Sequence, residues 1–277
     1  MDTYDCTAKD GTKLVVYHWP CPAARAQVLV LHGYGEHAQR YDELAQTFVA
    51  AGYDVVAPDL RGHGRSGGVR HFVQDFSSYF DDFDIVAAKA DELCPRLPRF
   101  LLGHSFGGLL ALAEVIDRMP KLVGLVLSSP FLRVKLSVPA WKLLAAKVAA
   151  KLYPQLTLPS GLSGAAVARD PEIAARYDAD PLNGKGATAG WFVESQKMQQ
   201  HVFDEAARVT LPVLLLHGEA DVVADPARSA EIFPRLGSED KTLALVTGAF
   251  HEIFNEPPVD RRRIMARVVS WLDAHRP

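Results

Sequence analysis

The chain alternates between short, almost wholly apolar runs and longer stretches whose apolar residues recur at helical spacing. The apolar runs predict strands buried on both faces, and they occur at 28–31, 54–57, 100–102, 122–127, 212–216 and 242–246. The intervening stretches predict helices at 41–51, 77–93 and 258–274. An antiparallel pair is expected over residues 3–18, around the Asp10-Gly11 turn. This alternation predicts an α/β fold with an open, mostly parallel sheet covered by helices on both faces.

The alternation stops after residue 130 and resumes near residue 196. Helical spacing predicts one helix at 139–152, with apolar residues on one face and lysines over the rest. Residues 154–190 are rich in Pro, Gly, Ala and Asp and show no strand pattern. We therefore expect a core formed by residues 1–130 and 196–277, with an inserted helical cap at 131–195.

A glycine-framed serine lies between a predicted strand and a predicted helix. Apolar residues 100–102 lead into Gly103-His104-Ser105-Phe106-Gly107, and a further apolar run follows. This is the strand, sharp turn and helix of a nucleophile elbow, in which strained backbone holds the serine hydroxyl clear of the sheet. Gly103 and Gly107 have no side chains, so the strand and helix can approach closely. We predict that Ser105 is a nucleophile.

Two later strand ends supply the partners that a serine nucleophile needs. A serine hydroxyl requires a base, the base requires an orienting group, and on this fold their order is serine, acid, histidine. Asp221 follows the 212–216 run and His251 follows the 242–246 run. We predict His251 as general base and then acid, with Asp221 holding its imidazole. Of the neighbouring acids, Asp225 precedes Pro226 and is the expected N-cap of a helix, and Glu219 is expected to be solvated.

Acyl transfer also needs backbone N–H groups that stabilise an oxyanion. We expect one from Phe106, the residue after the nucleophile, and one from Tyr34 in the glycine-rich loop after the 28–31 strand. A glycine turn without a catalytic role is the alternative for that loop. The loop at 61–66 lacks the lysine and spacing of a P-loop and is expected to support the same face of the sheet.

Composition limits the possible partners. The 277 residues are 48% apolar and 23% charged, with a net charge of −3, and no long basic stretch is present, so nucleic acid is not an expected partner. Cys6, Cys21 and Cys94 cannot all pair in disulfides, and their spacing fits no metal site. His63 has no second ligand at useful spacing, and we expect no metal and no cofactor. Without a signal-peptide pattern or a membrane-spanning run, the expected location is cytoplasmic.

Taken together, the serine elbow, the glycine-rich loop and the loops that carry Asp221 and His251 resemble the monoacylglycerol lipase and lysophospholipase family of α/β-hydrolases, the serine aminopeptidase S33-like group. The resemblance covers nearly the whole chain. It implies an α/β-hydrolase fold and a serine hydrolase that cleaves one carboxylic ester of a single-acyl glycerolipid through an acyl-enzyme intermediate. The segments that carry it are 32–37 with Arg40-Tyr41, 59–66, 103–108, 180–182, 241–243 and 248–252.

In that family, polar groups near the elbow hold the glycerol hydroxyls. The matching positions here are Glu36, Arg40, His104 and Tyr177. Pairing of Glu36 with Arg40, and packing of Tyr177 within the cap, are the structural alternatives. Mammalian members carry a second histidine three residues after the catalytic one, where this chain has Phe254. That departure concerns glycerol recognition rather than ester hydrolysis.

The cap is expected to provide an apolar pocket for one fatty chain. This expectation rests on five residues of the insertion, Trp141, Leu143, Leu144, Trp191 and Phe192. The lysines and Trp141 of the predicted helix at 139–152 also suit a membrane surface, so transient contact between the cap and a membrane is a further expectation. Ordinary packing of that helix on the core is the alternative. The oligomeric state stays open.

Other functions are compatible with the same scaffold. A broad-specificity short-chain carboxylesterase, an aminopeptidase or a thioesterase would use the same nucleophile. Dehalogenase and epoxide hydrolase chemistry is disfavoured because a serine, not an aspartate, occupies the elbow. A non-catalytic ligand-binding protein with a vestigial triad belongs to a different class, and the intact Ser105, Asp221 and His251 argue against it.

Overall fold

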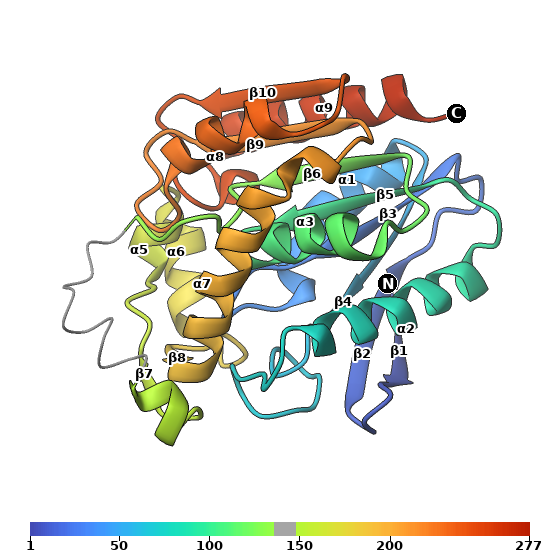
Figure 1. Cartoon of the computed structure of the whole chain (residues 1–277). Coiled ribbons are helices and arrows are strands. Elements are labelled where there is room, and N and C mark those ends of the chain that lie inside the picture. Colours follow the sequence, from blue (N-terminus) through green and yellow to red (C-terminus); the bar gives the residue numbers. More distant parts are fainter. Residues whose placement is uncertain (136–147) are drawn as a thin grey trace.

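An eight-stranded sheet forms the centre of the computed structural model, which describes residues 1–135 and 148–277 (Figure 1). Its two outer strands on one side are antiparallel, and the six strands that follow are parallel to one another. This arrangement confirms the predicted fold class. In spatial order the strands are β1 (Asp2–Thr7), β2 (Lys13–Trp19), β4 (Tyr53–Pro58), β3 (Ala26–Leu31), β5 (Arg99–His104), β6 (Gly124–Ser128), β9 (Val213–Gly218) and β10 (Lys241–Val246).

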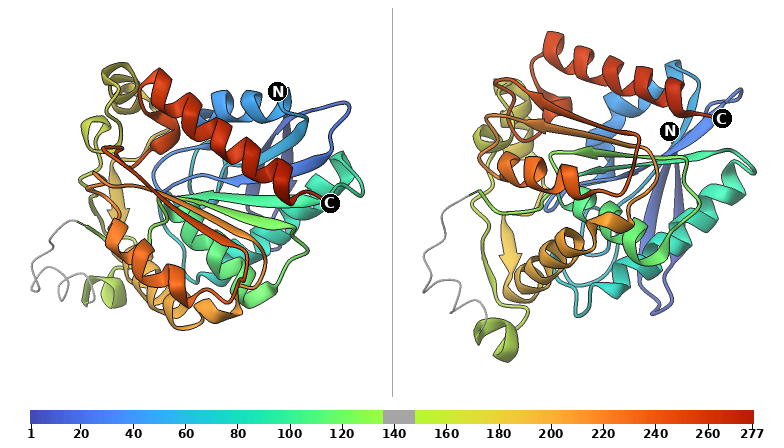
Figure 2. Two further views of the ribbon diagram at one scale, coloured as in Figure 1. Left: turned by 90° about the horizontal axis from the view of Figure 1, so that it is seen from above. Right: turned by 45° about the horizontal axis from the view of Figure 1, so that its top comes forward.

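Helices cover both faces of this sheet (Figures 1 and 2). One face packs against α1 (Asp42–Ala50) and α9 (Pro258–His275), and the other against α2 (Ser77–Leu93), α3 (Phe106–Arg118) and α8 (Pro226–Ile232). The helices predicted at 41–51, 77–93 and 258–274 are therefore present, that at 77–93 with the predicted bounds. Short 3-10 turns are η1 (Ala38–Tyr41), η2 (Ala206–Arg208), η3 (Phe233–Arg235) and η4 (Ile253–Asn255).

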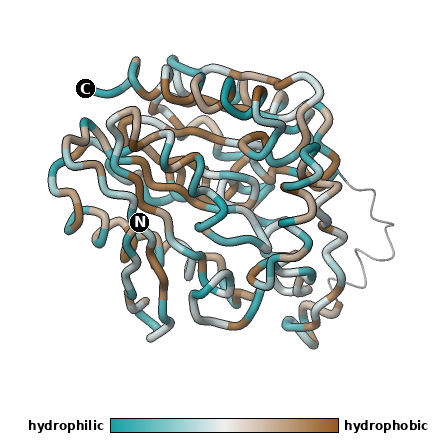
Figure 3. Tube along the Cα trace, turned by 180° about the vertical axis from the view of Figure 1, so that it is seen from behind, coloured by the Kyte–Doolittle hydropathy of each residue, from teal (hydrophilic) through white to brown (hydrophobic). Residues whose placement is uncertain are grey.

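The continuous apolar runs are explained by this two-sided cover. Along β3, Val28 and Val30 belong to the core under α1 and α9, whereas Leu29 and Leu31 belong to the core under α2 and α3. Successive side chains of a strand point to opposite faces, so a strand buried on both faces is apolar at most positions. Figure 3, which colours the chain by hydropathy, shows many apolar residues in the interior of the molecule.

The segment between β6 and β9 contains more structure than its sequence predicts. Residues 154–190 were expected to have no strands, but β7 (Thr157–Pro159) and β8 (Gly186–Thr188) pair antiparallel. This expectation is wrong because each strand is only three residues long and contains a proline or a glycine, which leaves no alternating pattern to detect. The same segment holds α5 (Gly164–Val167) and α6 (Pro171–Ala179), and α7 (Ala189–Asp204) follows directly after β8.

The predicted division into core and cap stays a prediction. Its boundary at residue 195 falls inside α7, which continues without interruption to Asp204. Of the helix predicted at 139–152, only residues 148–152 are described, and these are helical. Trp141, Leu143 and Leu144 lie outside the described residues. None of the described helices combines the length and the apolar character needed to cross a bilayer.

The parallel strands end level with one another, and this brings distant loops together. In the sheet register Leu31 lies opposite Gly103, His104 opposite Ser128, and Val246 opposite Gly218. The loops that follow β3, β5, β6, β9 and β10 therefore meet at one edge of the sheet, which is where ligands bind in open α/β sheets.

Candidate active site

Ser105 occupies the turn between β5 and α3 in a strained backbone conformation. Its φ of 51° and ψ of −116° lie outside the region that residues with side chains prefer. The surroundings hold this turn: the Ser105 N–H donates to the Ser128 carbonyl, and the Ser105 carbonyl accepts from the Phe131 N–H, each at 2.9 Å. A Cβ on Gly103 would collide with the carbonyl of Gly107, so strand and helix pack too closely for a side chain there.

Ser105, His251 and Asp221 form one hydrogen-bonded chain. Ser105 Oγ lies 2.8 Å from His251 Nε2, and His251 Nδ1 lies 2.6 Å from Asp221 Oδ2. Each residue exposes 6% or less of its surface. An ionised carboxylate only accepts hydrogen bonds, so Nδ1 carries the proton and Nε2 is free to accept the serine proton. The sequence predictions for these three residues thus fall on side chains that touch.

The charge on Asp221 is stabilised from several sides. Burial alone raises the pKa of its carboxyl, but interactions with His251 and His217 hold that pKa well below its usual range. His217 Nε2 donates to Asp221 Oδ2 at 3.0 Å, and the N–H groups of Val223 and Ala224 donate to Oδ1 at 2.7 and 3.0 Å. Burial alone lowers the pKa of His251. The charge of Asp221 and its hydrogen bond raise this pKa by more, so the net shift is upward.

The loop after β3 lies beside Ser105 and is held by two side chains. A Cβ on Gly33 would lie 3.2 Å from the Ser105 Cβ. His32 Nε2 accepts the Leu60 N–H at 2.9 Å, so the proton is on Nδ1, which donates to the Gly33 carbonyl at 2.7 Å. Glu36 Oε1 accepts the Gly33 N–H at 2.5 Å. Both polar groups of Gly33 are therefore fixed.

The hydrogen bonds to Gly33 set the direction of the Tyr34 N–H. The Gly33 carbonyl and the Tyr34 N–H belong to one planar trans peptide and point in opposite directions, so the N–H is directed away from His32. In the part of the chain that the structure describes, neither the Tyr34 N–H nor the Phe106 N–H donates to a protein acceptor. Both predicted oxyanion donors are thus left free to bind a ligand.

Of the two neighbouring residues predicted to bind substrate, Arg40 pairs both with the other, Glu36, and with Glu252. Arg40 Nη1 donates to Glu36 Oε2 at 2.5 Å and to Glu252 Oε1 at 2.6 Å, while Nη2 donates to Glu252 Oε2 at 2.7 Å. Burial raises the pKa of Glu36, but the Arg40 charge and its other partners lower it to about 2. Glu36 and Glu252 line a cavity that also borders Ser105 and His251, whereas Arg40 is not among the described residues that line it.

His104 and Tyr177 lie at the same end of that cavity. Burial lowers the pKa of His104 to about 4, with His251 as the next cause, so its imidazole is neutral near pH 7. The Tyr177 ring lies 4.7 Å from the Arg40 guanidinium carbon, and Tyr177 also belongs to a buried apolar cluster with Val167, Ala168 and Val223. Phe254, where mammalian members have histidine, is buried in η4 and exposes 5% of its surface.

The cavity above Ser105 is large and mostly apolar. Its volume is about 730 Å³. Trp191 of α7 stacks on Tyr34, with ring centroids 3.6 Å apart, and lies 5.1 Å from the Phe106 ring. The predicted acyl-pocket residues Trp191 and Phe192 both line the cavity, together with Phe131, Val134, Leu158 and Leu162.

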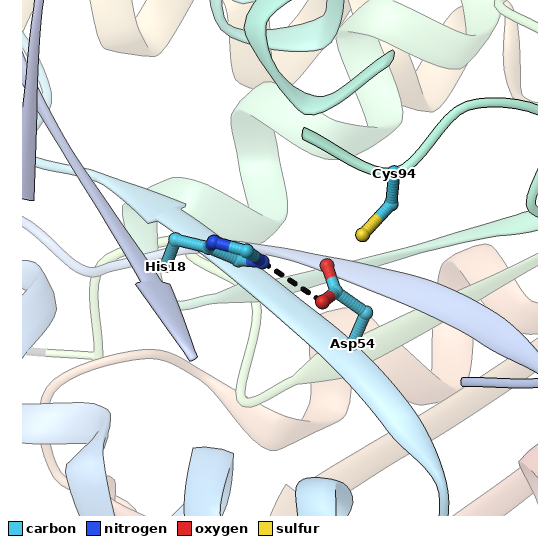
Figure 4. A group of neighbouring side chains, drawn as sticks. All are labelled: His18, Asp54 and Cys94. Atoms are coloured by element: carbon cyan, nitrogen blue, oxygen red, sulfur yellow. Dashed lines mark hydrogen bonds and ion pairs between the residues drawn. The ribbon is translucent and has the colours of Figure 1, made fainter. Parts of the chain in front are cut away.

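A second group of polar side chains lies at the opposite edge of the sheet, where β2 ends and β4 begins (Figure 4). One ligand atom each of His18, Asp54 and Cys94 lie within 4.8 Å of one another. The Asp54 carboxylate already accepts from His18 Nε2 at 2.8 Å, Cys21 N–H at 3.2 Å and Gln27 Nε2 at 3.2 Å. Burial raises the pKa of the Cys94 thiol to about 12, and a neutral thiol is a poor metal ligand. The Asp54 carboxylate is therefore already engaged by hydrogen bonds within the protein.

Sequence reasoning missed two residues of the site. His217 and Glu252 were not assigned roles, although one orients Asp221 and the other lines the cavity. Glu252 directly follows His251, and His217 precedes Asp221 by four residues, so position beside a predicted catalytic residue was the available signal. The other acids behave as predicted: Asp225 caps α8 through the Ala227 N–H, and Glu219 is exposed.

Comparison with known proteins agrees with this geometry. A family model described as serine aminopeptidase, S33, matches residues 22–258. The chain belongs to this family. It is 37% identical over 267 residues to the monoacylglycerol lipase of Mycolicibacterium smegmatis, covering 96% of this chain and 94% of that protein. It is 31% identical over 244 residues to phospholipase YtpA of Bacillus subtilis, covering 87% and 93% respectively.

A solved structure extends the comparison to three dimensions. The crystal structure of Paleococcus ferrophilus monoacylglycerol lipase matches with a TM-score of 0.85 at 32% identity, covering 99% of this chain and 100% of that chain. The resemblance inferred from the motifs is confirmed. The chain is a carboxylic ester hydrolase with the α/β-hydrolase fold.

Proposed function

We propose that this protein hydrolyses the ester bond of a single-acyl glycerolipid, a monoacylglycerol or a lysophospholipid, through an acyl-enzyme on Ser105. The observation that carries the proposal is the hydrogen-bonded chain from Ser105 through His251 to Asp221 at the base of an apolar cavity. Similarity to proteins named monoacylglycerol lipase and phospholipase supports the substrate class.

Acylation begins with the Ser105 hydroxyl. Its oxygen attacks the ester carbonyl carbon while His251 Nε2 takes its proton, and the Asp221 carboxylate stabilises the resulting imidazolium. The carbonyl oxygen becomes an oxyanion that accepts from the Tyr34 and Phe106 N–H groups. When the tetrahedral intermediate collapses, the carbon–oxygen bond to the alcohol breaks and His251 gives its proton to the departing alcohol oxygen.

Deacylation repeats these steps with water as nucleophile. His251 removes a proton from the water as the water oxygen attacks the acyl carbon, and the same two N–H groups hold the oxyanion. The bond to Ser105 Oγ then breaks, and His251 returns the proton to the serine. The products are a free carboxylic acid and the enzyme in its starting state.

The cavity suits one acyl chain with a polar alcohol at its end. Its volume of about 730 Å³ lies in the range typical of sites that enclose a whole small molecule. The apolar lining comes from residues such as Leu158, Leu162 and Phe192, while Glu36, His104 and Glu252 lie near Ser105 and His251. An apolar lining with polar groups near Ser105 favours a fatty ester over a short-chain ester or a peptide.

Hydrolysis rates measured side by side test the proposal. The substrates are monooleoylglycerol, oleoyl lysophosphatidylcholine, dioleoylglycerol and glycerol monoacetate, with Ser105→Ala as the inactive control. We expect the highest kcat/KM on one or both single-chain oleoyl lipids. A higher rate on the acetate would instead support a short-chain esterase, and no turnover of any ester would support a ligand-binding protein.

The cap also exposes apolar side chains that support transient contact with a membrane surface. Val148, Leu152, Tyr153, Leu156 and Leu158 are each at least 46% exposed and lie within eleven residues of one another in sequence. Such a group suits an interface where apolar side chains enter the lipid boundary. Co-sedimentation with phosphatidylcholine vesicles tests this: Leu152→Ser with Tyr153→Ser should reduce the bound fraction, and unchanged binding would contradict it. A cytoplasmic location stays part of the proposal.

A further inference from the structure

Glu252 lines the same cavity as His251, the residue beside which the leaving alcohol must lie. In the proposed reaction His251 Nε2 gives a proton to the alcohol oxygen, so the alcohol has to lie beside His251. Glu252 is the next residue, its backbone N–H is fixed to the Val167 carbonyl at 2.8 Å, and it lines the cavity. The Glu252 side chain exposes only 5% of its surface.

The ionised groups at this end of the cavity are predominantly negative. Arg40 supplies one positive charge to two carboxylates, Glu36 and Glu252, and all three are hydrogen bonded in one cluster. The cluster therefore keeps a net charge of about −1, because an arginine carries one charge at any ordinary pH. Two histidines also line this end of the cavity. His104 is neutral because burial lowers its pKa to about 4, and both ring nitrogens of His251 are engaged, by Asp221 and by Ser105.

Among the residues that the structure describes, no free lysine or arginine is positioned to receive an anionic group of a substrate. Of the residues that the structure describes around the cavity, none is Lys or Arg. Arg40 already directs Nη1 and Nη2 to carboxylates, and the Tyr177 ring lies 4.7 Å from its guanidinium carbon. A phosphate or carboxylate on the alcohol would lie beside Glu252 without a lysine or arginine partner among the described residues, and placing desolvated like charges together is strongly unfavourable.

We propose that Glu252 is a specificity-determining residue that rejects esters of anionic alcohols and leaves esters of neutral polyols as the substrates. This inference rests on the proposed function and narrows it. Monoacylglycerols pass the charge selection, whereas glycerolipids that carry a phosphate monoester on the alcohol do not. The selection acts through electrostatics, so an uncharged group of the same size is accepted.

A pair of esters that differ in charge but not in size tests the proposal with the wild-type enzyme. Oleoyl glycolamide and oleoyl glycolate carry a carboxamide and a carboxylate at the same position of the alcohol. With rates corrected for spontaneous hydrolysis, we expect kcat/KM to favour the glycolamide ester roughly 100-fold, as expected when like charges meet in a desolvated site. Monooleoylglycerol and 1-oleoylglycerol 3-phosphate, measured in parallel, should show the same direction.

Removal of the Glu252 charge identifies the residue responsible. Glu252→Gln should lower the glycolamide-to-glycolate ratio at least about tenfold, whatever its overall rate, because the ratio reports selectivity alone. Glu239→Gln is the matched control, since it removes an exposed carboxylate before β10 and should leave the ratio unchanged. If Glu252→Gln does not fold, Glu252→Ala replaces it.

The outcomes separate this inference from the proposed function. A wild-type ratio near one, or a folded Glu252 variant that keeps the wild-type ratio, overturns the charge selection even when monooleoylglycerol is hydrolysed. Failure to hydrolyse both monooleoylglycerol and oleoyl lysophosphatidylcholine overturns the proposed function, whatever the ratio. A high ratio that falls in the Glu252 variant and persists in the Glu239 variant supports the inference.

Discussion

Arg40 holds both carboxylate oxygens of Glu252, at 2.6 Å from Nη1 to Oε1 and 2.7 Å from Nη2 to Oε2. The pair joins the region after β3 to the loop that carries His251, and Glu36 extends it to Gly33 beside Ser105. The loop that supplies the Tyr34 N–H and the loop that supplies the proposed base are therefore tied together by one buried cation.

Arg40 should be essential for stability. Arg40→Met leaves two buried carboxylates without their cation, and breaking a buried ion pair in this way costs about 3–5 kcal/mol. Urea denaturation at pH 7 measures the loss. Arg176→Met, in α6, removes an arginine whose side chain is 66% exposed and should change stability by less than about 0.5 kcal/mol. Equal stability loss in both variants would contradict this account.

His32 should act on catalysis through the Gly33–Tyr34 peptide. His32→Ala removes the Nδ1 hydrogen bond to the Gly33 carbonyl and loosens the Tyr34 N–H. We expect kcat to fall roughly 10- to 100-fold with KM little changed, a smaller loss than deletion of an oxyanion donor. Steady-state kinetics on a neutral ester, with unfolding measured in parallel, provide the readout. An increase in KM at constant kcat would assign the loop to ground-state binding instead.

The pH dependence of kcat/KM should report His251. The base must be neutral to accept the Ser105 proton, so activity is lost as pH falls through the pKa of His251. Burial lowers that pKa but Asp221 raises it further, so the acidic limb should have its midpoint above about 6.5, the usual value for histidine. Asp221→Asn should move this midpoint downward and reduce kcat by about 10⁴-fold. A midpoint unaffected by this substitution would exclude the pairing.

Glu114 should make stability depend on pH between about 4.5 and 8. This α3 residue exposes 2% of its surface, and neither carboxyl oxygen has a hydrogen-bond partner among the described residues. Burial raises its pKa from 4.5 to about 8, with the Asp84 charge as the next cause. Because the folded-state pKa is raised, its contribution is fully present below pH 4.5 and is lost as pH rises through 8.

Glu114→Gln removes that dependence. Free energies of unfolding from urea titrations between pH 5 and pH 9 should decline more in the wild type than in the variant. The variant should therefore gain stability relative to the wild type at pH 9. Parallel pH profiles for the two proteins would show that the Glu114 carboxyl is ionised or solvated in the folded state.

The sequence alone predicts the sheet, the main helices and the elbow because each has a local cause. Buried strands are apolar at most positions, α2 shows helical spacing over its whole length, and Gly103 and Gly107 mark a close approach of backbone. Asp221 and His251 follow from the rule that parallel strands end at a common edge.

Other features depend on contacts that no local pattern encodes. Arg40 and Glu252 are 212 residues apart, so their pairing cannot be predicted from spacing, and Arg40 was expected at the substrate instead. The β7–β8 pair consists of two three-residue strands, too short to show a period. His217 donates to Asp221 from the end of the buried strand β9. Its position after four apolar residues gives no sign of this contact.

The central claim is that Ser105 is a nucleophile activated by His251. Reaction with a fluorophosphonate probe, followed by peptide mapping by mass spectrometry, tests it most directly. We expect one modified residue, Ser105, in the wild type and a large loss of labelling in His251→Ala. Labelling at another residue, or labelling of Ser105 that is equally fast without the imidazole, would contradict it.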